Sequence, residues 1–217
     1  MFRYEREMIP VLVENLSKAF NTEYITSEFR TGNGVADLVF TTGLNDESIF
    51  FNDYGIVSSY VNLFYQNKTQ STSELYKNCL DKSRLKKLLH KLEEAECIRF
   101  DGDTIVSVRK YLSHTHNLFS IEAKLNDWKS GFYQALRYKF FSHISYLAYP
   151  QKFIHRVDLD LLRDNDIGLI SVAENSIEFV LNPKSKIPED ITSYLFLSEL
   201  FAQPFKTNMI HGQLERV

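Results

Sequence analysis

The chain has 217 residues, of which 44% are apolar and 24% charged, and its net charge is −3. These values are typical of a globular protein with one sizeable core, or with one core and a small module. No apolar run reaches the ~18 to 20 residues of a membrane-spanning helix, and the first residues lack the layout of a secretory signal. We therefore expect a cytoplasmic protein that has no membrane partner.

The first 45 residues predict one helix and a hairpin. Apolar residues spaced three and four apart indicate an amphipathic helix over residues 4–20, in which Pro10 either kinks the helix or delays its start. Residues 22–29 and 35–41 have the composition of two strands, joined by a turn rich in Gly and Asn. The second strand carries Asp37 within an otherwise apolar run.

The character of the chain changes over residues 46–114. Helices are expected over residues 53–64, 71–79 and 82–95, followed by a hairpin of strands 97–100 and 104–108. The third helix has leucines on one face, and its exposed side carries four basic residues, Arg84, Lys86, Lys87 and Lys91. Residues 50–112 carry a net charge of +2 and the rest of the chain −5, so a DNA-binding surface is compatible with an acidic protein.

The last hundred residues return to an alternation of buried strands and helices. Residues 118–125 form an apolar run that places Glu122 and Lys124 on one side of a strand, because side chains two apart share a face. The helix expected over residues 129–141 carries Gln134 and Tyr138 on a common side. Strands are further expected at 144–149, 167–172 and 176–181, and helices at 153–162 and 190–201.

Two resemblances follow from these residues. Three helices and a hairpin, with a basic third helix, resemble a winged helix-turn-helix module. With residues 46–114 set aside, the element order, Asp37, the Glu122-Ala-Lys124 strand and Gln134 resemble the PD-(D/E)XK nuclease superfamily, or restriction-endonuclease-like fold. Ala36 stands where the family name has proline. The resemblance implies an α/β (α+β) fold with a mixed central sheet flanked by helices. Its core would be discontinuous, residues 1–45 and 115–217, with the winged-helix module 46–114 inserted.

The chemistry of a phosphodiesterase fits these side chains. Asp37 and Glu122 supply hard oxygen ligands suited to Mg²⁺ or Mn²⁺, and Lys124 can orient or help deprotonate the attacking water. The resemblance further implies that Gln134 contacts the site and that Arg137 or Tyr138 reaches toward phosphate. It also implies an additional acid from the first helix, for which Glu7 and Glu14 are the candidates. We expect a metal-dependent DNA endonuclease.

Several alternatives stay open at this stage. The nuclease-like core could serve as a scaffold for a non-catalytic DNA-binding, assembly or regulatory protein. The inserted helices could contact a protein partner, or their basic residues could form an ordinary solvated helix face. The sequence also leaves open whether the chain forms a homodimer, and whether DNA or RNA is the substrate.

Overall fold

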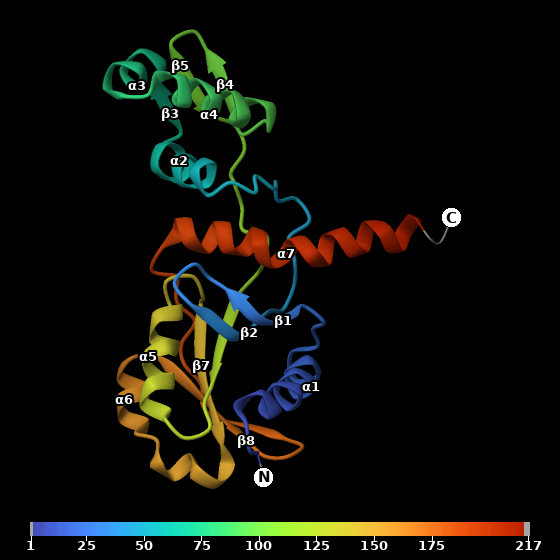
Figure 1. Cartoon of the computed structure of the whole chain (residues 1–217). Helices are drawn as coiled ribbons and strands as arrows, with labels where there is room; N and C mark the ends of the chain where they lie inside the picture. Colours follow the sequence, from blue (N-terminus) through green and yellow to red (C-terminus); the bar gives the residue numbers. More distant parts are fainter. Residues whose placement is uncertain (1, 215–217) are drawn as a thin grey trace. The chain divides into compact units, whose positions relative to one another are not determined.

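The computed structural model describes the backbone of residues 2–214 and the side chains of residues 2–207 (Figure 1). The chain divides into two compact units: Met1–Leu44 with Thr115–Val217, and Asn45–His114. The first boundary lies one residue from the one expected from the sequence, and the second coincides with it. The first unit is therefore discontinuous in the chain, and the second is an insertion within it.

The first unit is built on a six-stranded mixed sheet with the strand order β1-β2-β6-β7-β8-β9. Its strands are β1 (Ile25–Arg30), β2 (Val35–Thr41), β6 (Leu118–Ala123), β7 (Ile144–Pro150), β8 (Ile167–Val172) and β9 (Ile177–Leu181). β6, β7 and β8 are parallel, whereas β1, β2 and β9 pair antiparallel with their neighbours. The three parallel strands are almost entirely buried, as expected for strands covered on both faces. The predicted mixed α/β class is confirmed.

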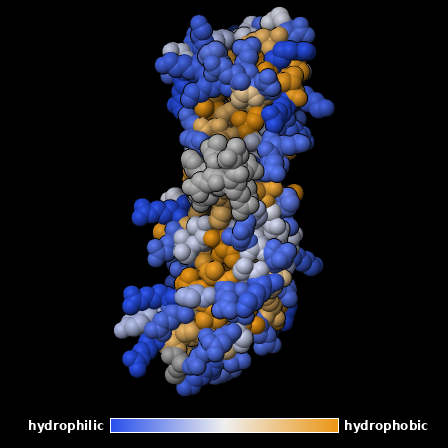
Figure 2. All heavy atoms as spheres, turned by 90° about the vertical axis from the view of Figure 1, so that its right-hand side faces the viewer, coloured by the Kyte–Doolittle hydropathy of each residue, from blue (hydrophilic) through white to orange (hydrophobic). Residues whose placement is uncertain are grey.

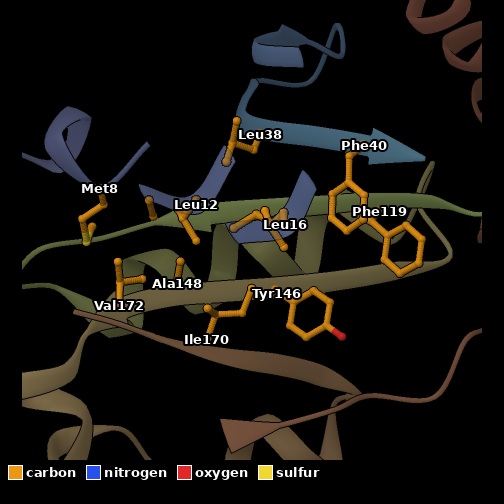
Figure 3. Close-up of a cluster of buried hydrophobic side chains, with 12 residues drawn as sticks. Met8, Leu12, Leu16, Leu38, Phe40, Phe119, Tyr146, Ala148, Ile170 and Val172 are labelled. Carbon is orange, nitrogen blue, oxygen red and sulfur yellow. The ribbon is translucent and has the colours of Figure 1, made fainter. Parts of the chain in front are cut away.

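Helices cover both faces of this sheet (Figure 1). On one face α1 (Met8–Phe20) packs Met8, Leu12 and Leu16 against side chains of β2, β6, β7 and β8 (Figure 3). On the other face lie α5 (Trp128–Tyr138) and α6 (Leu159–Asp164). A short 3-10 turn, η1 (Glu5–Glu7), precedes α1. Pro10 lies in the first turn of α1, where a missing backbone N–H leaves no helical hydrogen bond unmade.

Three elements of the first unit differ from the sequence prediction. The helix expected over 153–162 is divided into a 3-10 segment, η2 (Gln151–Arg156), and α6, because the Asp158 side chain accepts hydrogen bonds from two backbone N–H groups and starts a new helix. β1 begins at Ile25 rather than at residue 22. The last helix, α7 (Ile191–Leu214), continues beyond residue 201 and through Pro204. Its Phe201 packs against Phe29 of β1.

The second unit contains three helices and a small sheet of its own. In chain order it has α2 (Tyr54–Phe64), β3 (Thr69–Ser71), α3 (Thr72–Asn78), α4 (Lys82–Glu94), β4 (Ile98–Asp101) and β5 (Thr104–Ser107). The side chains of Asp53, Ser71 and Asp81 cap the three helices. The hairpin β4–β5 has the predicted position. β3, which pairs with β5, was not predicted, because its three polar residues show no alternation of apolar and polar side chains.

Figure 2 shows hydrophobic side chains gathered in patches that hydrophilic side chains border on the face that it presents. Within residues 2–214, no helix combines the length and the apolar character needed to cross a membrane.

Candidate metal and catalytic site

Asp37 and Glu122 lie side by side where β2 and β6 separate. The last ladder pair of these antiparallel strands is Leu38 with Ile121, so continuing the register by one residue brings Asp37 opposite Glu122. Opposed residues of an antiparallel pair point to the same face. Beyond this pair, the Ala123 N–H donates to the side chain of Asp37 at Oδ2, 2.7 Å away, rather than to a backbone carbonyl of β2. The two carboxylates therefore share one face of the sheet.

Both oxygens of Glu122 are engaged. Oε1 lies 2.8 Å from Lys124 Nζ, and Oε2 accepts from the Tyr138 hydroxyl at 2.8 Å. The Glu122 residue is only 1% exposed, so its charge depends on these two partners. The Tyr138 hydroxyl also lies 2.7 Å from the Val35 carbonyl oxygen. Since it has one proton, the hydroxyl can serve only one of these two acceptors at a time.

The environment shifts the acid–base behaviour of both carboxyl groups in the same direction. Burial and the neighbouring charge of Asp37 raise the pKa of Glu122, although Lys124 and Tyr138 oppose the shift. Burial also raises the pKa of Asp37, and the hydrogen bond from Ala123 opposes it. Glu122 is buried and Asp37 half-buried, and two like charges so close together disfavour their joint ionisation. A cation at this position would offset that repulsion.

Lys124 is held as an ammonium ion. Burial acts to lower its pKa, but the hydrogen bond and charge of Glu122 outweigh burial and raise it. A protonated lysine donates hydrogen bonds and cannot accept a proton. In this arrangement Lys124 can therefore orient a water molecule or offset negative charge, rather than act as a base.

Glu5 also belongs to this cluster, and the sequence did not point to it. Its Oε1 accepts from the Leu125 N–H at 3.1 Å, and its Oε2 lies 3.6 Å from Lys124 Nζ. Glu5 stands in the 3-10 turn before α1, and Leu125 stands 120 residues further along the chain. No spacing or periodicity in the sequence connects these two segments.

Gly131 of α5 makes room for the lysine. A Cβ atom at this position would lie 2.6 Å from Lys124 Cγ and 2.6 Å from Leu147 Cδ1. These distances are well inside van der Waals contact, so any larger residue would displace the lysine stem or Leu147. Gly131 therefore positions Lys124. A glycine inside a predicted helix was the available signal for a close approach.

Other residues predicted for the site are placed differently. Glu14 forms an exposed pair with Lys18 at 2.6 Å, and Glu7 accepts from the backbone N–H of Arg3 at 2.6 Å. A role for either as the additional acid stays a prediction, and the acid that the structure has near Lys124 is Glu5. Arg137 is exposed on α5, and among the side chains that the structure describes no hydrogen bond or ion pair joins it to Asp37 or Glu122.

Gln134 and Tyr138 lie one turn apart on α5, as expected from the sequence. Tyr138 is buried and contacts Glu122, so the structure brings it into the site. Gln134 is half-buried, and among residues 2–207 no hydrogen bond joins its amide to Asp37, Glu122 or Lys124. A role for Gln134 at the site remains a prediction.

The donor set at this position fits a hard divalent cation. Asp37 Oδ1 accepts no hydrogen bond from the residues whose side chains are described, and Glu122 faces the same side. Those residues include no group of three or more His, Cys, Asp or Glu arranged to hold a metal ion. The protein would therefore supply two carboxylates, and water and phosphate would fill the remaining positions, which is a common arrangement for Mg²⁺.

The four basic residues predicted to contact nucleic acid all lie on α4 of the second unit, where they are exposed. They divide into two groups. Arg84, Lys87 and Lys91 line a groove of about 390 Å³ between α2 and α4, whereas Lys86 does not. Lys91 lies 3.7 Å from Asp53. Arg84 and Lys87 form no ion pair within 4.0 Å among the residues whose side chains are described, so their charges are the least compensated of the groove.

Comparison of the chain with protein-family models, with curated proteins and with solved structures found no match.

Proposed function

We propose that the protein is a metal-dependent DNA endonuclease of the PD-(D/E)XK type, with Asp37 and Glu122 as metal ligands. One observation carries the proposal: two carboxylates face one another at the open end of β2 and β6, with Lys124 Nζ 2.8 Å from Glu122. These are the oxygen ligands and the adjacent cation that phosphodiester hydrolysis uses.

The arrangement of the first unit supports the proposal. A helix, an antiparallel pair of strands, and a third strand with the Glu-Ala-Lys segment are followed by a crossover helix and a parallel strand. This is the order from which the restriction-endonuclease-like fold was inferred. In this arrangement Asp37 and Glu122 lie on the face of the sheet that α5 covers. Tyr138 of α5 donates a hydrogen bond to Glu122 there.

Each side chain of the site would have a separate role in hydrolysis. A bound Mg²⁺ or Mn²⁺ would offset charge on the phosphate and lower the pKa of water. Asp37 and Glu122 would hold that ion, and Lys124 would orient the attacking water and offset charge that develops in the transition state. Tyr138 fixes the orientation of Glu122. Glu5 and Gly131 position Lys124 from two sides.

Cleavage of supercoiled plasmid in the presence of Mg²⁺ or Mn²⁺ tests the proposal. We expect nicked product from the wild type, and loss of that product with EDTA, with Asp37→Ala and with Lys124→Ala. Glu14→Ala is the matched control, since this exposed carboxylate lies in an ion pair with Lys18. Equal nicking by all four proteins would show that another site, or a contaminant, cuts the DNA.

The second unit would hold the DNA as a winged helix. Its order of elements, with β3 joining the hairpin in the sheet β3-β5-β4, supports this assignment more fully than the hairpin alone. α4 would be the recognition helix and β4–β5 the wing. The basic residues of α4 would then contact phosphates or base edges.

Salt-dependent DNA binding tests the role of α4. We expect the double variant Arg84→Gln/Lys87→Gln to bind duplex DNA more weakly and to reduce the slope of log affinity against log salt by about two, since each phosphate contact contributes about 0.9. Lys86→Gln tests whether the part of α4 outside the groove also contacts DNA, because Lys86 does not line the groove. A control that removes two exposed lysines elsewhere in this unit, Lys77→Gln/Lys110→Gln, should have a smaller effect. Unchanged affinity in the α4 variants would favour a protein partner for this helix.

A second candidate function is DNA binding without cleavage. It is favoured by the engagement of both Glu122 oxygens by Lys124 and Tyr138, which is also what a purely structural buried carboxylate would show. This candidate requires salt-sensitive DNA binding with no metal-dependent nicking. The plasmid and binding measurements together separate the two functions.

A further inference from the structure

A cavity of the first unit has Leu125, the residue after Lys124, in its wall. It has a volume of about 310 Å³ and lies at the carboxyl ends of the parallel strands β6, β7 and β8. Its lining is mainly apolar and includes Phe2, Leu125, Pro150 and Phe153. The polar members are Gln151, the cation Lys152 and the carboxylate Glu174. Ligand sites of open α/β sheets favour this edge, and this volume is at the small end of the range for ligand pockets, about 300 to 1,000 Å³. The cavity therefore suits one small ring system.

Glu5 joins this cavity to the candidate catalytic site. One carboxylate oxygen of Glu5 holds the backbone N–H of Leu125, a residue that lines the cavity, and the other lies near Lys124 Nζ. Leu125 directly follows Lys124 in the chain. The cavity wall and the lysine are therefore adjacent in the chain and share Glu5 as a partner.

The chemistry of the cavity wall points to an aromatic ligand attached to phosphate. The Phe153 ring has two cations near it: the Arg156 guanidinium carbon lies 4.4 Å from the ring centroid, and Lys152 Nζ lies 5.6 Å from it. Aromatic rings and guanidinium planes are the groups on which unpaired nucleobases stack, and cations beside them attract the connecting phosphates. The exposed amide of Gln151, at the rim, can donate to and accept from the edge of a base.

We infer that this cavity binds an unpaired nucleobase of the DNA strand that is cut, next to the scissile phosphate. The inference rests on the proposed function and specifies its substrate class. A base inside a duplex is stacked and paired, so it could enter only after flipping, which costs energy, whereas an unpaired base enters without that cost. The preferred substrate is then single-stranded DNA, or a duplex with an unpaired nucleotide.

Binding measured in EDTA tests the inference separately from cleavage. The probes are oligonucleotides that carry 2-aminopurine, a base whose fluorescence falls on stacking, either in a single strand, or unpaired within a duplex, or fully paired. We expect quenching with the first two probes and little with the third. Phe153→Ala should weaken binding of the single strand by about tenfold, as expected for loss of one base–aromatic stack.

Two further variants keep the test decisive. Ala173→Leu adds volume to the cavity wall without removing any group, and should abolish the quenching because the base no longer fits. Phe140→Ala is the matched control, because Phe140 is half-buried like Phe153 but follows the end of α5, away from the cavity. Quenching that survives both cavity variants, or equal binding of paired and unpaired probes, would overturn the inference.

The outcome is distinguishable from failure of the proposed function. Suppose that quenching depends on Phe153 but that the protein nicks neither plasmid nor single strands with any metal. The base-binding cavity would then be supported, and the nuclease function would be rejected. Metal-dependent nicking without quenching of the unpaired probes would support the nuclease function and reject the base-binding cavity.

Discussion

Asp37→Asn is expected to lower the rate of metal-dependent cleavage by about a thousandfold or more, since a bound metal supplies several kcal/mol of transition-state stabilisation. The fold should not suffer. The Asn side-chain oxygen can still accept from the Ala123 N–H, as Asp37 Oδ2 does at 2.7 Å. The amide nitrogen would then face the position of the cation, where a donor replaces a ligand.

Stability measured against pH separates this effect from misfolding. Burial raises the pKa of Asp37 in the folded protein. The stability linked to such a group is present below its unfolded pKa and is lost as the pH rises through the folded pKa. At pH 8 in EDTA, Asp37→Asn removes the free-energy cost of holding a charged Asp37 in the folded protein. It also removes a negative charge next to Glu122. We therefore expect a melting temperature equal to that of the wild type or a few degrees higher.

Added metal should reverse the order of stability, so that the wild type becomes more stable than Asp37→Asn. Mn²⁺ at about a hundred times its dissociation constant should stabilise the wild type by about 2.7 kcal/mol and Asp37→Asn far less. Asp190→Asn is the control, because Asp190 likewise accepts from a backbone N–H, that of Ser193, at the start of α7. An equal gain in melting temperature for all three proteins would remove Asp37 from the list of metal ligands.

The position of Asp37 shows what the sequence could and could not predict. The alternation of side chains along a strand placed Glu122 and Lys124 on one side, and the structure has them in contact. That Asp37 faces the same side depends on the pairing of Leu38 with Ile121, two residues 83 positions apart in the chain. A register shifted by one residue would turn Asp37 toward α1. The sequence restricts this register only through the apolar pattern of both strands.

The buried strands were the most predictable part of the fold, because β7 and β8 are continuous apolar runs of a length that suits strands. The contacts that were missed depend on tertiary structure. Glu5 reaches the site because η1 is packed beside the end of β6, and the short polar strand β3 forms because β5 offers it a partner. Neither has a local pattern, since the interaction that defines each lies far along the chain.

Lys124→Met is expected to destabilise the folded protein by about 3 kcal/mol at pH 8, and by much less at pH 5. The substitution leaves the buried carboxylate of Glu122 without the cation that now lies 2.8 Å away. The pKa of Glu122, already raised by burial and by Asp37, should rise further. Because the linked stability is lost as the pH rises through the folded pKa of a group shifted in this direction, the destabilisation should grow between pH 5 and pH 8.

Urea unfolding at several pH values measures this dependence, and Lys139→Met provides a matched control. Lys139 is buried to a similar degree, with 19% of its side chain exposed against 16% for Lys124, but its partner Glu189 is 66% exposed and 3.8 Å away. Water can solvate Glu189 once its partner is removed, so the effect of Lys139→Met should vary little with pH. The double variant Glu122→Gln/Lys124→Met should recover much of the lost stability, since the fully buried side chain at position 122 then carries no charge to be compensated. A loss that is the same at pH 5 and pH 8, or that persists in the double variant, would mean that Lys124 stabilises the site through packing against Gly131 rather than through its charge.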